Sequence, residues 1–293
     1  MRFSKTAVLM LACLLASLLL PPAHAKPVTS SKSALNLLKI NQYYVLYTNP
    51  VIPRLDKSGT FVVGAEAIAL MLNAKFTQNP QATTVTLTKA GHSVRFTAGA
   101  KTALVDGKPV AVPIAAQTQP SKRQMLIPLS VLTQAFRIRS AWNPKRHTLF
   151  LSGKTLMKFS RFEDAFAYVY WENPGPDTHS LVPVALTTKP VPWFPSIRRL
   201  EVTVKNASRR TIPKDFGFVN MLAADKNRGP HDTVITYGVG GTPLPSEAAE
   251  PHPAWKPGAT RKSSTIISPT PYPSGYTAEV IYVAVWPVVK GHL

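Results

Sequence analysis

The sequence predicts an α+β domain with an internal duplication, followed by an all-β sandwich of short strands. The first observation is a repeat: moved along itself by 64 residues, the chain aligns residues 62–80 with residues 126–144 without a gap. The second is a change after residue 153, where helical periodicity fades, prolines become frequent and short alternating segments follow one another. A repeat of this length indicates one supersecondary unit present twice.

The first 25 residues have the pattern of a secretory signal peptide. Arg2 and Lys5 precede an apolar run over residues 6–20, and residues 23–25 form a small-x-small cleavage site. Lipidation at Cys13 is the alternative. Cleavage after residue 25 removes the one cysteine, so an exported mature chain must be stabilised by its core. We expect a secreted or envelope-associated bacterial protein, a flexible leader over residues 26–37 and no transmembrane span after cleavage.

Each copy of the repeat consists of an apolar lead-in, a short helix, an Asn-Pro turn and a strand. In the first copy, Ala67, Ile68, Met71 and Leu72 form one apolar stripe of a helix. The turn follows at residues 79–80, because a residue before proline avoids the helical region. The equivalent stripe of the second copy contains Val131, Leu132, Ala135 and Phe136. Between the copies, Asp106-Gly107 predicts a hairpin with a type I′ turn.

Residues 38–153 resemble the copper amine oxidase N-terminal-like domain, the stalk module of many exported bacterial proteins. The resemblance rests on Leu-Ile-Pro-Leu at residues 126–129, Trp-Asn-Pro at residues 142–144 and the Asp-Gly hairpin. The first copy departs from the pattern, with Gly64 where proline is usual and Gln78 where tryptophan is usual. The resemblance implies a duplicated α+β stalk-like domain that is a non-catalytic appendage.

Residues 154–293 are expected to form the second domain. Strands are predicted near residues 166–171, 200–205, 216–222, 233–237, 261–267 and 278–286. Alternation in two of these segments predicts burial of Val202, Val204, Ile281, Val283 and Val285. The layout of strands and turns resembles immunoglobulin-like modules of exported bacterial proteins, which implies a β-sandwich.

The charge is strongly unbalanced, with 34 Lys and Arg against 14 Asp and Glu. Removal of Arg2 and Lys5 with the leader lowers the formal net charge from +20 to +18. Such a field attracts polyanions, and the partner expected for an exported protein is an anionic cell-wall polymer or peptidoglycan. The alternative is a protein suited to an acidic habitat. The cations are scattered, so no specific nucleic-acid binding is indicated, and the oligomeric state stays open.

No catalytic or metal-binding signature is present. The histidines do not pair at i+3 or i+4 and no cysteine joins them, so neither a metal nor another cofactor is expected. We therefore predict a protein without enzymatic activity, a binding or scaffolding module. The alternative is a hydrolase of cell-wall polysaccharide, with carboxylates in the C-terminal domain or a pair such as Glu66 and Glu172 across a cleft.

The candidate binding residues form a basic and aromatic patch. Two tryptophans lie in Pro-rich segments, where exposed rings would stack on sugars, and three cations lie near one of them. These residues are Trp193, Trp255, Lys256, Arg261 and Lys262. By contrast, Trp142, Phe136 and Trp286 are expected in the core. Asn206 opens an Asn-Ala-Ser glycosylation sequon that we expect to be unused.

Overall fold

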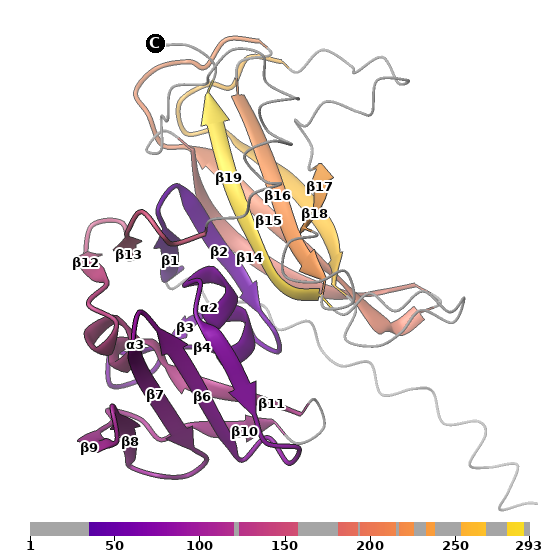
Figure 1. The fold of residues 1–293 in the computed structure, drawn as a ribbon. Coiled ribbons are helices and arrows are strands. Elements are labelled where there is room, and N and C mark those ends of the chain that lie inside the picture. Colours follow the sequence, from indigo (N-terminus) through magenta and orange to yellow (C-terminus); the bar gives the residue numbers. More distant parts are fainter. Residues whose placement is uncertain are drawn as a thin grey trace, which may run out of the picture.

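The computed structural model describes residues 35–119, 123–157, 181–192, 194–214, 217–225, 233–237, 253–267 and 280–289 (Figure 1). The described chain is mostly β-strand, with two short helices and four sheets. It therefore has the β-rich composition that the sequence predicts. None of the described helices is long and apolar enough to span a bilayer. The strand expected near residues 166–171 lies outside the described residues.

The strands and helices of residues 35–157 follow the order lead-in strand, helix, hairpin in both copies. They are β1 (Leu37–Ile40), β2 (Tyr43–Thr48), β3 (Arg54–Leu55), β4 (Phe61–Gly64), α2 (Ala65–Met71), β5 (Lys75–Gln78), β6 (Thr84–Lys89), β7 (His92–Thr97), β8 (Thr102–Val105), β9 (Lys108–Ala111), β10 (Gln117–Gln119), β11 (Gln124–Pro128), α3 (Leu129–Ala135), β12 (Arg139–Asn143) and β13 (Thr148–Ser152). The offset of 64 residues relates the starts of α2 and α3, of β5 and β12, and of β6 and β13.

The remaining strands belong to residues 181–289, in which the described chain has no helix. They are β14 (Leu181–Val191), β15 (Phe194–Asn206), β16 (Gly217–Asp225), β17 (Thr233–Tyr237), β18 (Thr260–Ile267) and β19 (Val280–Val289). Strands β14, β15 and β18 form a three-stranded sheet, sheet D. Strands β16, β17 and β19 join a seven-stranded sheet, sheet A, in the order β12-β13-β1-β2-β19-β16-β17.

Sheet A crosses the boundary that the sequence suggests near residue 153. Strand β2 lies beside β19 (Figure 1) and pairs with it in antiparallel register, so that Tyr44 lies opposite Val285 and Val45 lies opposite Ala284. The other two sheets belong to residues 35–157: sheet B has the order β10-β11-β4-β3, and sheet C has the order β5-β6-β7-β8-β9. The two parts of the chain are thus joined by a backbone ladder and not only by a linker.

Strand β2 is buried on both faces, because each face belongs to a different core. Tyr43 and Val45 pack in the cluster with both helices, whereas Tyr44 and Leu46 pack in the cluster between sheets A and D. Consecutive side chains of a strand point to opposite faces, which explains this division. A strand that reads as a continuous apolar run is therefore the shared wall of two cores.

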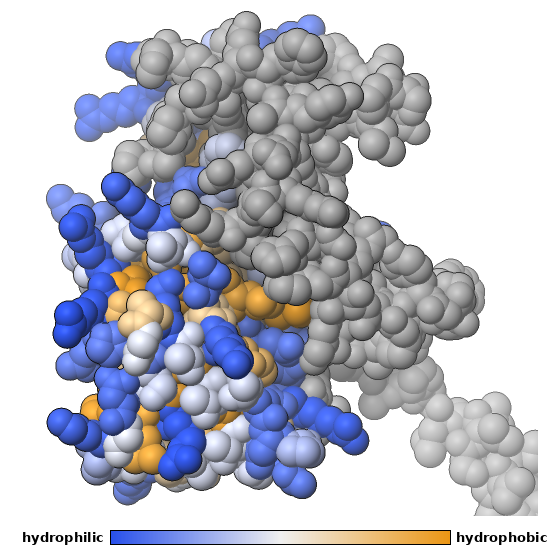
Figure 2. Space-filling model, in the orientation of Figure 1, coloured by the Kyte–Doolittle hydropathy of each residue, from blue (hydrophilic) through white to orange (hydrophobic). Residues whose placement is uncertain are grey.

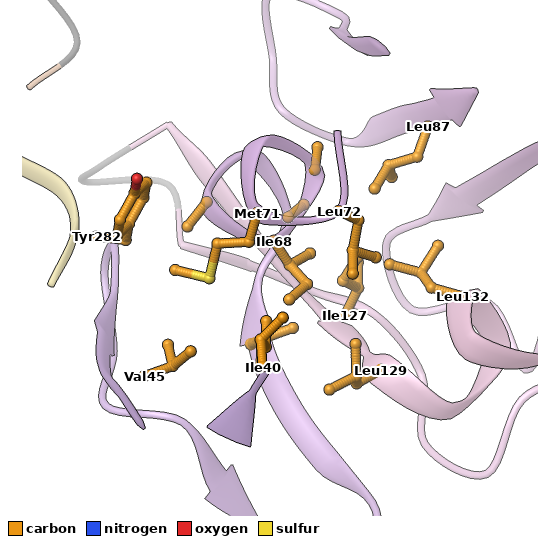
Figure 3. Close-up of a cluster of buried hydrophobic side chains, with 14 of the residues drawn as sticks. Ile40, Val45, Ile68, Met71, Leu72, Leu87, Ile127, Leu129, Leu132 and Tyr282 are labelled. Atoms are coloured by element: carbon orange, nitrogen blue, oxygen red, sulfur yellow. The ribbon is translucent and has the colours of Figure 1, made fainter. Parts of the chain in front are cut away.

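The first core is built around helix α2. Ile68 and Met71 of α2 and Leu72 directly after it are fully buried there, and Figure 3 shows Ile68 and Leu72 lying near Ile40 and Ile127. The Met71 side chain extends towards Tyr282 of β19. The apolar stripe expected from the sequence is therefore the buried face of the helix, and part of what it contacts comes from the far end of the chain.

The second core lies between sheet D and the adjoining strands of sheet A. The burial predicted for Val202, Val204, Val283 and Val285 is confirmed, since each is 0% exposed. Ile281 is also buried, but it packs in the first core rather than between the two sheets. The register between β16 and β19 shifts at this point, where Tyr282 pairs with Ala224 and Val280 pairs with Asp225, so Ile281 has no register partner on β16.

The loop after β2 touches the start of α2 at Gly64. A Cβ atom at this position would lie 2.0 Å from the carbonyl oxygen of Asn49. The amide of Gly64 donates to Thr48 Oγ1 at 3.0 Å, and the amide of Asn49 donates to the carbonyl of Ile281 at 2.7 Å. The departure from proline in the first copy therefore follows from a backbone approach that no side chain would permit.

Strand β1 carries a buried lysine next to β2. Lys39 is 1% exposed, and its ammonium lies 4.6 Å from the ring centre of Tyr44 and 5.7 Å from that of Phe150. A cation over aromatic faces is attracted by the ring quadrupoles. Burial raises the pKa of Tyr44 to about 12, and Arg146 opposes this rise. The hydroxyl of Tyr44 is therefore neutral at physiological pH.

Candidate functional site

Trp255 lies at the centre of the region where the candidate binding residues gather. The residue is 2% exposed and packs in the core between sheets A and D. Its indole Nε1 donates to the carbonyl of Ala259 at 2.9 Å, and its backbone exchanges two hydrogen bonds with Ile212. The expectation of an exposed stacking ring is wrong for Trp255, because a ring buried in this way has no face for a sugar.

Asn206 holds the loops around Trp255 together. Its side chain donates to the carbonyls of Arg210 at 2.9 Å and Trp255 at 2.7 Å, and it accepts two hydrogen bonds from Ser208. Its backbone pairs with Ala259 and Gly258. An amide with this many partners at 0% exposure fixes the geometry of both loops. It also leaves no free nitrogen for a glycan in the folded protein.

Exposed cations surround the buried residues Asn206 and Trp255. We call the following six residues the basic surface: Lys205, Arg209, Arg210, Lys214, Lys256 and Lys262. They lie on the loops, and on the strand positions beside them, at the end of sheet D where β15 finishes and β18 begins (Figure 1). Figure 2 shows hydrophilic side chains projecting at the top of the C-terminal part.

The register of sheet D places two of these cations side by side. Lys205 pairs with Thr260, and Thr203 pairs with Lys262, so the two lysines are diagonal neighbours on one face. Such neighbours are separated by about 7–8 Å. Within the described ranges, no residue of the basic surface forms an ion pair with a carboxylate. Two of the positive charges therefore lie close together, and neither forms an ion pair with a described carboxylate.

Glu201 is a carboxylate on β15, the strand that ends in the basic surface, and it has its own partner. Lys189 Nζ lies 2.8 Å from Glu201 Oε2, and the hydrogen bond from Lys189 is the main cause that lowers the pKa of Glu201. The charge of Lys262 lowers the same pKa further. Glu201 is therefore ionised at neutral pH and is paired away from the basic surface.

The structure brings together three of the five candidate residues around the buried Trp255. Lys256 and Lys262 are exposed, as the patch requires. Arg261 is half-buried; its guanidinium lies 4.4 Å from the ring centre of Trp255 and donates to the carbonyl of Pro253. Arg261 is thus a structural clamp on the indole. Trp193 lies outside the described residues.

Sequence reasoning missed four members of the basic surface: Lys205, Arg209, Arg210 and Lys214. They are about 50 residues from Lys256 in the chain, so no local pattern connects them. The one available signal was the Lys-Asn-Ala-Ser-Arg-Arg run at residues 205–210, a basic turn after a clean strand. Pairing of β15 with β18 converts these two distant segments into one surface.

Trp142 is exposed, contrary to the expectation that it belongs to the core. The side chain is 43% exposed on β12, an outer strand of sheet A. Its ring centre lies 6.3 Å from that of Phe61 and 6.4 Å from that of His147. Phe136, at 8% exposure, and the partly buried Trp286 do pack in the first core.

The described residues contain no cluster of three or more His, Cys, Asp or Glu that could hold a metal. Glu66, one carboxylate of the alternative hydrolase pair, lies in the first turn of α2 and accepts a hydrogen bond from Gln124 Nε2 at 3.0 Å. Glu172, the other carboxylate of that pair, lies outside the described residues.

Comparison with protein families gives one match. Residues 39–151 match the family model of the copper amine oxidase N-terminal domain. The resemblance noted from the repeat is therefore confirmed over this range. Neither the curated proteins nor the solved structures contain a match to the chain.

The copper amine oxidase N-terminal domain is a non-catalytic domain of the stalk type. Its match ends at residue 151, before β14 begins, so the basic surface lies wholly outside it. Trp142, by contrast, lies inside it. The family match therefore carries no information on the function of the C-terminal part, which depends on the residues at its own surface.

Proposed function

We propose that this chain is a secreted bacterial envelope protein without enzymatic activity, which binds an anionic cell-wall polymer through the basic surface. The observation that carries the proposal is the group of six exposed cations on two loops and the adjoining ends of β15 and β18, where Asn206 and Trp255 hold the loops together. The signal-peptide pattern supports export, and the stalk-type domain supports a scaffolding role. We further infer that the N-terminal part is a duplicated α+β unit and that the C-terminal part is immunoglobulin-like.

The physical basis is neutralisation of fixed charge. A concentrated cationic surface near a polyanion gains free energy as counterions are released from the polymer. Exposed charges are screened over about 8 Å at physiological ionic strength, so added salt must weaken such binding. Asn206 and Trp255, the buried frame of the basic surface, keep the two loops in place. This lowers the entropic cost of presenting several cations at once.

The experiment is retention of the mature protein on purified cell wall at low and high salt. The test variant combines Lys205→Gln, Lys256→Gln and Lys262→Gln, and it leaves Arg261 intact because that side chain supports the fold. Each exposed charge contact contributes about 0.5 kcal/mol, so we expect retention at low salt to fall about tenfold. High salt should reduce retention of the unmodified protein to a similar level.

The matched control combines Lys57→Gln, Lys75→Gln and Lys101→Gln, three exposed lysines of the N-terminal part. It removes the same charge from a different surface and should retain most of the binding. Equal loss in both variants would mean that net charge rather than the basic surface is responsible. Retention that is absent at low salt, or indifferent to salt, would contradict the proposal and favour the acidic-habitat explanation. Release of soluble sugar from the wall would instead support the hydrolase.

A further inference from the structure

Among the side chains that the structure describes, Trp142 is the most exposed aromatic one. It lies on β12 at one end of sheet A, whereas the basic surface belongs to sheet D and its loops. At 43% exposure, the indole leaves a large apolar surface in contact with water, whereas the apolar side chains of the core are buried.

The indole is held in one orientation by two ring contacts. Phe61, itself 3% exposed, lies at an angle of 56° to it, and His147 lies edge-on at 80°. The backbone beneath it is fixed by the turn in which the amide of Arg146 donates to Asn143 Oδ1 at 3.1 Å. An aromatic ring that is both exposed and immobilised loses little entropy when a ligand stacks on it.

Two exposed polar residues lie close to Trp142 in the fold. Ser140 is exposed and lies two residues before Trp142, so both side chains point to the same face of β12. His147 is exposed and touches the ring edge. Both side chains bear hydrogen-bonding groups that suit hydroxyl partners, and no described carboxylate pairs with either.

We propose that Ser140, Trp142 and His147 form a stacking site for the pyranose rings of an uncharged polysaccharide chain. Sugar rings have apolar faces that stack on indole, and their hydroxyl groups accept and donate hydrogen bonds at the rim. This site uses no charge, so its binding is insensitive to salt. It is independent of the basic surface and would give an envelope polymer a second, chemically different point of attachment.

The experiment measures binding of two neutral probes, the β-1,4-linked hexamers of glucose and of N-acetylglucosamine, to the full mature protein by calorimetry. The titrations are made at low and high salt. We expect at least one hexamer to bind with a dissociation constant that salt leaves unchanged. Because the indole supplies the stacking face, Trp142→Ala should weaken binding by up to about tenfold, and Trp142→Phe by less.

Trp142→Ala also removes packing against Phe61, so two further variants test the site with the indole in place. Ser140→Arg places a long side chain beside the ring and should block stacking. His147→Asn keeps a residue that tolerates the positive φ of 47° at this position and should weaken binding moderately. The lysine triple variant of the basic surface is the control, and it should bind the hexamers normally.

The outcomes separate this site from the basic surface. The stacking site is overturned if neither hexamer binds the unmodified protein, or if Trp142→Ala and Ser140→Arg both bind as tightly as the unmodified protein. Neither result bears on the basic surface. Binding that disappears at high salt or in the lysine triple variant also overturns it, because the contact then belongs to the basic surface.

Discussion

Val63 of β4 lies directly opposite Ile127 of β11, and the two residues hold the same position in the two copies of the repeat. Next to them, Gly64 faces Leu126 rather than its own equivalent, Pro128. An antiparallel pair that crosses equivalent positions in this way has a local two-fold axis at its centre. The two copies therefore face each other across β4 and β11, and their hairpins extend into different sheets.

The first prediction concerns Gly64, where the two copies differ in residue type: the second copy has Pro128 at the equivalent position. Gly64→Ala should destabilise the protein by about 3 kcal/mol, because its Cβ would lie 2.0 Å from the carbonyl oxygen of Asn49 and the backbone would have to move. Urea denaturation followed by fluorescence measures the loss. Pro128→Ala, the equivalent change in the second copy, is the control and should cost much less. An unchanged midpoint for Gly64→Ala would show that the loop after β2 yields freely.

The second prediction concerns the strand that the two cores share. A fragment ending at residue 157 lacks β19, and it leaves Tyr44 and Leu46 of β2 without the core against which they pack. We expect this fragment to unfold without a cooperative transition, whereas the mature chain unfolds cooperatively. Circular dichroism during thermal unfolding tests it. A sharp transition in the fragment would show that residues 35–157 are an autonomous domain.

The third prediction concerns the frame of the basic surface. Asn206→Ala should destabilise the protein by about 2–3 kcal/mol, because the carbonyls of Arg210 and Trp255 lose their donor in a buried setting. Retention on cell wall at low salt should fall with it, although no charge is removed. Ser208→Ala is the milder control, since it removes one hydroxyl and leaves both donations from Asn206. Full retention in Asn206→Ala would mean that the loops need no frame.

The fourth prediction concerns a carboxylate that links two hairpins. Asp106 Oδ2 lies 2.8 Å from His92 Nδ1, and the amide of Ser93 donates to Oδ1 at 2.8 Å. The hydrogen bond from His92 is the first cause that lowers the pKa of Asp106. A carboxyl group whose pKa is lower in the folded state stabilises the fold at pH values above its unfolded pKa. This stabilisation is lost as the pH falls through the folded pKa. Any contribution of Asp106 to stability should therefore disappear only in acid.

Carbon-13 NMR of the side-chain carboxyl tests this prediction directly. The titration midpoint of Asp106 should lie below its ordinary value of 3.8. His92→Phe should raise the midpoint, because the main hydrogen bond to the carboxylate is lost. Lys101→Gln, a change of charge on the same part of the chain, should leave it nearly unchanged. A midpoint at the ordinary value in the unmodified protein would contradict the hydrogen bond.

Local periodicity predicted several elements of this chain, although it missed β5, β12 and β14, and it predicted none of the partners that are distant in the chain. The stripe of Ile68 and Met71 is a property of the sequence itself, so the position of α2 and its buried face could be predicted. The pairing of Tyr44 with Val285 joins residues about 240 apart, and alternation has the same pattern whichever strand lies alongside. The continuous sheet was therefore not visible in the sequence.

The two tryptophans show the same limit at the candidate sites. Trp255 is flanked by prolines, an alanine and a lysine, which is typical of an exposed loop, yet the distant Asn206 and Ile212 draw it into the core. Trp142 was expected inside, but β12 is an outer strand, so nothing described covers the open side of its ring. Burial of a large ring depends on neighbours in space, and a sequence window contains only neighbours along the chain.

The buried sequon has a consequence for production of the protein in other organisms. A eukaryotic secretory pathway recognises Asn-Ala-Ser in the nascent chain, before the amide of Asn206 has found the carbonyls of Arg210 and Trp255. A glycan attached then occupies the nitrogen that the folded loops require. Material from such a host would contain a fraction that is glycosylated and cannot complete the C-terminal fold, whereas a bacterial host without this modification would give one uniform species.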